Sequence, residues 1–393
     1  MTPAPSVLDL TRQLVGIDSQ NPGTGERDIA KFTCDYAAQR GMEAQVVETA
    51  EGRCNVLVTI DAGPGPRLGL SGHLDTKPIG DALPVWRTDP LELTVDGDLA
   101  YGLGSSDMKG AVAAMLLAAE RWAGRASRGR LTLVLTADEE AGSEHGAKEL
   151  SRRGLVDADA IVIGEPSGIS EPWEALYVVS RGICCFEVVI EGTQGHSGLS
   201  EQLPTSATVA AARATVALSG FRPGSTAPAA VDSRPTVNAA VRTEGGVFYG
   251  VHPGNAVVSC DIRTVPGMER GALEREVRAL LADALPDDVA WDLRYVPGSL
   301  GWMEPAELDL AHPVLGAAQR ACREVLGREL PLAAYPGGTD ATHFIRIAGI
   351  PSITALGPGW LSVAHGPNEC VGVGQLDEAV LLYDRLAHAY LGG

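Results

Sequence analysis

The stretch Tyr101-Gly-Leu-Gly-Ser-Ser-Asp-Met-Lys-Gly110 leads into residues 111–122, which are almost all Ala, Leu, Met and Val. This composition predicts a buried helix, and the small residues before it predict a tight turn. Asp107 therefore lies at the start of the helix, where unpaired backbone N–H groups and the helix dipole favour a carboxylate. Because Ser and Asp at such a position are most often helix caps, the turn alone does not indicate a functional site.

The segments around this helix alternate between predicted strands and helices. We expect strands near residues 67–71, 131–136 and 160–163. The middle run is continuously apolar, which is typical of a parallel strand whose two faces are both covered. The alternation predicts an α/β layer architecture with a mainly parallel central sheet.

Near Val178 the pattern changes. Between residues 183 and 295 the predicted order is strand, helix, strand, strand, helix, strand, which is the ferredoxin-like split unit. The α/β pattern then resumes. We therefore expect a discontinuous first domain of residues 1–178 and 296–393, interrupted by an inserted ferredoxin-like domain at residues 179–295.

The formal charge of −19 argues against nucleic acids and anionic membranes as partners. No apolar segment is long enough to cross a bilayer, and residues 1–9 lack the basic and apolar runs of a signal peptide. The seven cysteines are odd in number and scattered, which favours reduced thiols over a disulfide framework. We therefore expect a cytoplasmic protein that binds neither nucleic acid nor membrane.

Histidines and carboxylates follow the ends of several predicted strands, namely His73, Asp75, Glu139, Glu140, Glu165 and, far downstream, His365. If the sheet is parallel, these strand ends share its carboxyl edge, where open α/β sheets build their sites. Each motif alone is more commonly a surface ion pair, a cap or a solvated acidic turn. Together with Asp107 they favour a site for two divalent ions, and mixed N/O ligands fit Zn²⁺, with Co²⁺ and Mn²⁺ as alternatives.

Two pairs suggest a division of labour within this site. His73 and Asp75 lie two apart on a strand, so Asp75 can hold the second ring nitrogen of His73, directly or through water. Glu139 and Glu140 are adjacent and point in different directions. One of them can bind a metal ion while the other takes a proton from an activated water molecule.

The ordered set of motifs resembles the M20 metallopeptidase family, which includes acetylornithine deacetylase, succinyl-diaminopimelate desuccinylase and glutamate carboxypeptidase. The resemblance covers essentially the whole chain. It is carried by Ser71-Gly-His-Leu-Asp75, Gly104-Ser-Ser-Asp-Met-Lys-Gly110, Thr136-Ala-Asp-Glu-Glu140, Gly164-Glu-Pro-Ser167 and Ala364-His-Gly-Pro-Asn-Glu369.

The resemblance implies a role for each residue of the cluster. The ligands of two zinc ions would be His73, Glu165, Glu140 and His365, with Asp107 bridging the ions. Asp75 would orient His73, and Glu139 would be the general base. The resemblance also implies a cis peptide bond between Asp107 and Met108.

The resemblance further implies that the inserted domain forms a homodimer and caps the site. His196 would then reach the partner subunit's site and stabilise the oxyanion. The residues that would contact the substrate are Arg263, Arg181, Gly338 and Thr339, and the two arginines suit a carboxylate. Gly250 stands where relatives often carry Asn, and the turn Gly337-Gly-Thr-Asp340 lacks the Ser that is usual in desuccinylases.

We therefore expect a dizinc hydrolase that cleaves the amide bond of a small substrate with a free carboxylate, and we favour an N-acyl amino acid as that substrate. A dipeptidase or carboxypeptidase on the same site is the alternative within enzymes. The alternative from another class is a metal-stabilised binding protein without turnover, against which the intact Glu139 speaks.

Overall fold

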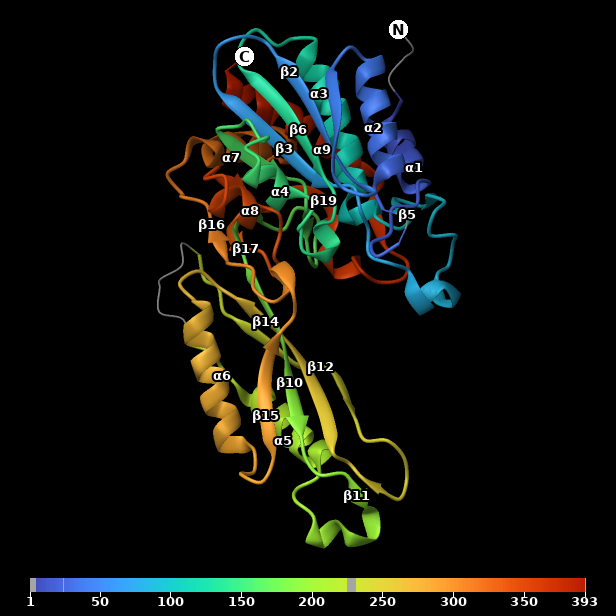
Figure 1. The fold of residues 1–393 in the computed structure, drawn as a ribbon. Helices are drawn as coiled ribbons and strands as arrows, with labels where there is room; N and C mark the ends of the chain where they lie inside the picture. The colour runs from blue at the N-terminus through green and yellow to red at the C-terminus, as the bar shows by residue number, and fades with distance from the viewer. Residues whose placement is uncertain (1–4, 24, 225–230, 393) are drawn as a thin grey trace. The chain divides into compact units, whose positions relative to one another are not determined.

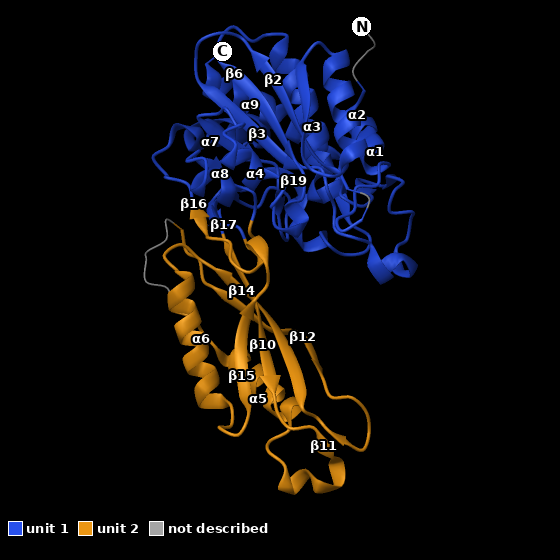
Figure 2. Cartoon of the chain, in the orientation of Figure 1, with its two compact units in different colours: residues 1–180, 307–335, 339–393 blue, residues 181–306, 336–338 orange. Residues whose placement is uncertain are grey.

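The computed structural model describes residues 5–23, 25–224 and 231–392. The chain divides into two compact units (Figure 2). Unit 1 contains residues 1–180, 307–335 and 339–393, and unit 2 contains residues 181–306 and 336–338.

Unit 1 is built on a six-stranded sheet with the order β1-β2-β6-β3-β7-β18 (Figure 1). Its strands are β1 Glu43–Ala50, β2 Arg53–Asp61, β3 Arg67–His73, β6 Arg130–Thr136, β7 Ala160–Ile163 and β18 Ser352–Ile353. β2 is antiparallel to both its neighbours, whereas β6, β3, β7 and β18 pair in parallel. The sheet is thus mostly parallel, which confirms the predicted fold class.

Helices cover this sheet, namely α1 Val7–Val15, α2 Arg27–Gln39, α3 Gly110–Ala123, α4 Ala147–Arg152, α7 Pro313–Leu326, α8 Ala341–Arg346 and α9 Val373–Leu391. α3 is the predicted apolar helix, and it packs against α9 and α1 with ten consecutive residues, 110–119, buried. Its approach to β3 is close, because a Cβ atom at Gly72 would lie 3.2 Å from Val112 Cγ2. α4 and α8 join a separate apolar cluster that includes Val134 of β6 and Ile161 of β7.

Short strands surround the carboxyl edge of the main sheet. They form three small sheets from β4 Thr94–Asp96, β5 Leu99–Tyr101 and β20 Cys370–Gly372, from β8 Pro166–Gly168 and β19 Gly357–Trp360, and from β9 Leu176–Ser180, β16 Ala306–Glu307 and β17 Leu332–Ala334. β20 pairs with β5, so the segment before β20 is held next to the turn after β5. That turn is the Gly102–Gly110 stretch, which contains Asp107.

Unit 2 has a four-stranded antiparallel sheet with the order β12-β14-β10-β15. Its elements are β10 Gly182–Glu191, α5 Ala207–Gly220, β12 Thr236–Gly245, β14 Asn255–Thr264, α6 Arg270–Ala284 and β15 Ala290–Tyr295. This is the predicted βαββαβ order. Alternate residues of β10 and β14, such as Phe186 and Val258, form one core with both helices. A small ribbon of β11 Gly195–His196 and β13 Val251–His252 follows β10.

No helix among the described residues combines the length and the apolar character that crossing a bilayer requires.

Candidate metal centre

The five predicted ligands come together at the carboxyl edge of the main sheet. Parallel strands β3, β6 and β7 end at residues 73, 136 and 163, so the residues that end or follow them lie side by side. His73 Nε2 lies 2.9 Å from Asp107 Oδ1 and 3.7 Å from Glu165 Oε1. His365 Nε2 lies 3.2 Å from Asp107 Oδ2 and 3.1 Å from Glu140 Oε2.

Asp107 occupies the middle of this cluster. Each of its oxygens faces a different imidazole, Oδ1 toward His73 and Oδ2 toward His365. Burial alone would raise the pKa of the Asp107 carboxyl, but hydrogen bonds from His365 and His73 outweigh burial and lower it. The Asp107–Met108 peptide bond is cis, as the resemblance implies.

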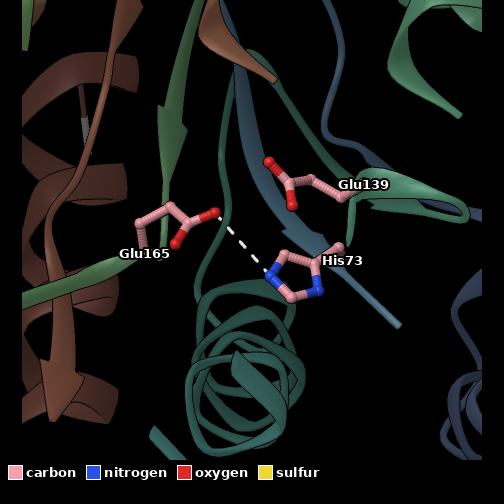
Figure 3. Close-up of side chains that lie close together, drawn as sticks. All are labelled: His73, Glu139 and Glu165. Carbon is pink, nitrogen blue, oxygen red and sulfur yellow. Dashed lines mark ion pairs between the residues drawn. The ribbon is translucent and has the colours of Figure 1, made fainter. Parts of the chain in front are cut away.

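Glu139 and Glu165 flank His73. Figure 3 shows both carboxylates directed toward the imidazole, with the ion pair drawn to Glu165. Ligand atoms of His73, Glu139 and Glu165 lie within 4.8 Å of one another, and so do those of His73, Asp107 and Glu140. Burial, and then the neighbouring negative charges, raise the pKa of Glu165 well above its usual range.

The donor set fits divalent cations. Four carboxylates meet in one cluster, in which Asp107, Glu140 and Glu165 are buried and Glu139 is partly exposed, and like charges so close together require neutralisation. Glu140 Oε1 is buried and has no hydrogen-bond partner among the described residues. Imidazole nitrogens and carboxylate oxygens are ligands of Zn²⁺, and they also bind Co²⁺ and Mn²⁺.

The backbone of Asp75 contacts His73 more closely than its carboxylate does. His73 Nδ1 donates to the Asp75 carbonyl oxygen at 2.9 Å, whereas Asp75 Oδ1 lies 3.7 Å from the same nitrogen. This bond leaves Nε2 facing Asp107. The Asp75 carboxylate instead accepts the backbone N–H groups of Glu139 and Glu140 at 3.2 and 3.1 Å. It therefore fixes the start of the segment that carries both glutamates.

Three further residues contact the cluster, and no role for them could be predicted from the sequence. Asn21 donates to Asp75 Oδ2 at 2.9 Å, and Lys77 Nζ lies 3.2 Å from Glu140 Oε2. The Tyr335 hydroxyl donates to Glu165 Oε2 at 3.4 Å. Lys77 and Tyr335 are close in sequence to a recognised motif or turn and Asn21 is not, and only the fold shows which way each side chain points.

The residues predicted to contact substrate are divided between the two units. Thr339 belongs to unit 1, where its backbone N–H donates to Ser180 Oγ at 3.0 Å. Arg181, Arg263 and Gly338 belong to unit 2, and Ile183, two residues after Arg181, pairs with Arg263 across β10 and β14. Burial, and then the charge of Arg263, lower the pKa of Arg181.

His196 lies apart from these arginines within unit 2. It follows the far end of β10, a strand of ten residues, whereas Arg181 directly precedes its start. At about 3.3 Å per residue the strand separates them by roughly 30 Å. The His196 side chain is exposed, and its Nδ1 accepts the Gly198 N–H at 3.0 Å.

Comparison with known proteins adds a family and several relatives. A model of peptidase family M20/M25/M40 matches residues 69–389. Succinyl-diaminopimelate desuccinylase of Xanthomonas campestris pv. campestris is 29% identical over 395 residues, covering 93% of this chain and 99% of that protein. The enzyme of the same name from Alkalilimnicola ehrlichii is 29% identical over 339 residues, covering 84% and 85%.

Solved structures share the fold across almost the whole chain. An M20 family metallo-carboxypeptidase from Sulfolobus solfataricus superposes with a TM-score of 0.81 at 19% identity, covering 98% of this chain and 99% of that one. Human carnosine dipeptidase 1 gives a TM-score of 0.76 at 20% identity, covering 98% and 96%.

Proposed function

Because the chain belongs to peptidase family M20/M25/M40 and is a metal-dependent amide hydrolase, we propose that it deacylates an N-acyl amino acid with a free carboxylate. The observation that carries this proposal is the Asp107 carboxylate, whose two oxygens face two imidazoles with further carboxylates beside them. The relatives at 29% identity are named for removing a succinyl group from diaminopimelate, which favours deacylation.

We assign the ligands of two ions from these contacts. His73 and Glu165 would hold one ion, Glu140 and His365 the other, and Asp107 both. Zn²⁺ is the ion that the donor set suits best, with Co²⁺ and Mn²⁺ as alternatives. When bound, such ions lower the pKa of a water molecule and polarise a carbonyl group.

Glu139 is the proposed general base. Its neighbour Glu140 is buried and contacts His365, whereas Glu139 is partly exposed and directs its carboxylate at the cluster beside His73 (Figure 3). It can therefore take a proton from the attacking water and return it to the departing amine. Asp75 supports this role, because its carboxylate holds the Glu139 backbone N–H.

Substrate recognition is assigned to Arg181, Arg263 and the turn that contains Gly338 and Thr339. Two neighbouring guanidinium groups can bind a carboxylate through several hydrogen bonds. Neutral His196 carries its ring proton on Nε2, because Nδ1 accepts from Gly198. The exposed Nε2–H is a donor suited to an oxyanion. The separation of His196 from the arginines supports its action in a second copy of the chain.

A homodimer through unit 2 fits the surface of that unit. β12 is an edge strand, and Val241 on it is 58% exposed. Val209 and Val216 lie seven residues apart on α5 and are both exposed, as are Phe248 and Tyr249. Exposed apolar residues beside an open sheet edge favour association.

All seven cysteines are free, which supports a reducing, cytoplasmic setting.

A dipeptidase or carboxypeptidase activity is the second candidate. The turn Gly337-Gly-Thr-Asp340 departs from the turn usual in desuccinylases, and proteins with the same fold include a carnosine dipeptidase and a metallo-carboxypeptidase.

A substrate panel separates these possibilities. Protein loaded with Zn²⁺, Co²⁺ or Mn²⁺ would be assayed for amine release from N-acetyl and N-succinyl amino acids and from dipeptides. We expect the highest kcat/KM on an N-acyl amino acid. Higher kcat/KM on dipeptides would support the second candidate, and binding of N-acyl amino acids without any release would indicate a binding protein.

A further inference from the structure

The loop that carries His365 also carries a buried carboxylate outside the proposed ligand set. Glu369 is only 2% exposed, and it reaches the turn that presents Asp107. Its Oε2 accepts the Gly104 N–H at 2.9 Å, and its Oε1 accepts the N–H groups of Ser106 and Asp107, both at 2.9 Å. Its backbone carbonyl accepts the Gly102 N–H at 3.0 Å.

These bonds use N–H groups that the chain cannot satisfy by regular structure. Asp107 has the non-helical torsion angles φ −125° and ψ 90°, and Gly104 has φ 76°. A buried backbone N–H without a partner is costly. Three donors converge from one side, and only a carboxylate offers two acceptor oxygens within a single short side chain.

Both oxygens of Glu369 act as acceptors, which is the arrangement of an ionised carboxylate. Glutamine at this position has one carbonyl oxygen and one NH₂ group. It would direct its NH₂ at one or two of the same N–H groups, so it cannot reproduce the bonds.

The contacts link two proposed ligands to each other. The Asp107 backbone N–H is bound by Glu369, and the Asp107 side chain contacts His365, four residues before Glu369. A second attachment holds the same turn, because Ser106 Oγ donates to the Trp360 carbonyl at 3.1 Å and accepts the Trp360 N–H at 2.7 Å. The turn and the 360–369 segment therefore form one hydrogen-bonded body.

We propose that Glu369 is a positioning residue of the metal centre, which holds the Gly102–Asp107 turn so that the Asp107 carboxylate faces both His73 and His365. The inference rests on the proposed function, in which Asp107 binds both ions. Glu369 contacts neither imidazole in the described structure and acts through the backbone. Its loss should therefore weaken metal binding without removing a ligand.

The test compares Glu369→Gln with the wild type and with Tyr383→Phe. The control removes another buried hydrogen bond of unit 1, from the Tyr383 hydroxyl to the Leu356 carbonyl at 3.0 Å, and leaves the turn untouched. Zn²⁺ affinity of the full-length, metal-free proteins would be measured by competition with a chromophoric chelator. The visible absorption spectrum of the Co²⁺-loaded proteins would report the ligand geometry.

We expect Glu369→Gln to bind Zn²⁺ about 10- to 100-fold more weakly, the usual effect of losing a group that supports a ligand, and to show an altered Co²⁺ spectrum. Tyr383→Phe should match the wild type in both. A wild-type affinity and spectrum for Glu369→Gln would overturn the proposal, and so would equal losses in both variants. A wild-type protein that binds no metal would overturn the proposed function, and with it this inference.

A second measurement needs no variant. Hydrogen exchange of the metal-free wild type should show slow exchange of the Gly104, Ser106 and Asp107 amides, because each is bonded to a buried carboxylate. Exchange of these amides at the rate of an open turn would also overturn the proposal.

Discussion

Asn21 offers a way to disturb the centre from outside the proposed ligand set. Its side-chain NH₂ donates to Asp75 Oδ2 at 2.9 Å and to Asp138 Oδ1 at 3.1 Å, and its carbonyl oxygen accepts from Arg53 at 2.8 Å. Asn21→Ala deletes all three bonds, each to a charged group. Asp75 in turn holds the backbone N–H groups of Glu139 and Glu140, so the loss reaches the proposed base and one ligand.

The expected loss of stability in Asn21→Ala follows from the charged groups that Asn21 bonds. A hydrogen bond to a charged group contributes about 1.5–3 kcal/mol, and these bonds share partners, so their losses do not add in full. We expect Asn21→Ala to lose roughly 3 kcal/mol or more of unfolding free energy. Asp75 is two residues from the proposed ligand His73, and it supports the backbone of Glu139 and Glu140. We therefore expect kcat/KM to fall by about 10- to 100-fold.

Ser19→Ala provides a matched control for this prediction. Ser19 is buried in the same loop, and its hydroxyl donates to the Leu74 carbonyl at 2.7 Å. Both variants would be compared by urea unfolding, metal content and kcat/KM on the best substrate of the panel. Asn21→Ala should lose activity well beyond Ser19→Ala. Equal kcat/KM values for the two variants would show that the connection through Asp75 has no role in catalysis.

Two other predictions concern a buried histidine and an arginine that is proposed to bind the substrate. Burial, and then the charge of Lys148, lower the pKa of His343 to about 4 from 6.5, against the opposing charge of Glu144. Between pH 6.5 and 4 the unfolded chain therefore binds a proton at His343 that the folded chain does not bind. The unfolding free energy falls by roughly 3 kcal/mol as the pH is lowered through this range. In urea unfolding of the metal-free proteins, the unfolding free energy of His343→Leu should fall by roughly 3 kcal/mol less than that of the wild type between pH 6.5 and 4. An unchanged pH dependence would contradict the assignment of this effect to His343. Arg263→Lys loses the planar fork that binds a carboxylate, so KM should rise by about tenfold or more with little change in kcat; steady-state kinetics that show only a fall in kcat would exclude a role in substrate binding.

Much of the fold follows from local patterns. The apolar run at 111–122 gave helix α3, and the continuous apolar run at 131–136 gave β6, because both are long, buried elements. The direction of β2 could not be predicted, because the burial of Asn55 to Val58 is the same in a parallel or an antiparallel strand. β8 (Pro-Ser-Gly) and β19 (Gly-Pro-Gly-Trp) could not be predicted, because they consist mainly of Pro and Gly, which are depleted in strands.

The proximity of the proposed ligands could be predicted because each of them ends or follows a strand or stands before a helix, and parallel strands bring their ends together. The contacts that support this cluster could not be predicted. Glu369 lies within a recognised motif, but its contacts with the Gly104–Asp107 turn span more than 260 residues of sequence. His343 is 4% exposed, and its surroundings could not be predicted, because they depend on the packing of α8 against α4.

We propose a two-ion centre in which Glu139 moves the proton. Its most direct test is to load the wild type and Glu139→Gln with Zn²⁺, count the ions per chain by elemental analysis, and measure turnover on the same samples. We expect two ions per chain in both proteins, with kcat lower by about 10²- to 10⁴-fold in Glu139→Gln. A Glu139→Gln protein that keeps wild-type turnover with two bound ions would contradict it.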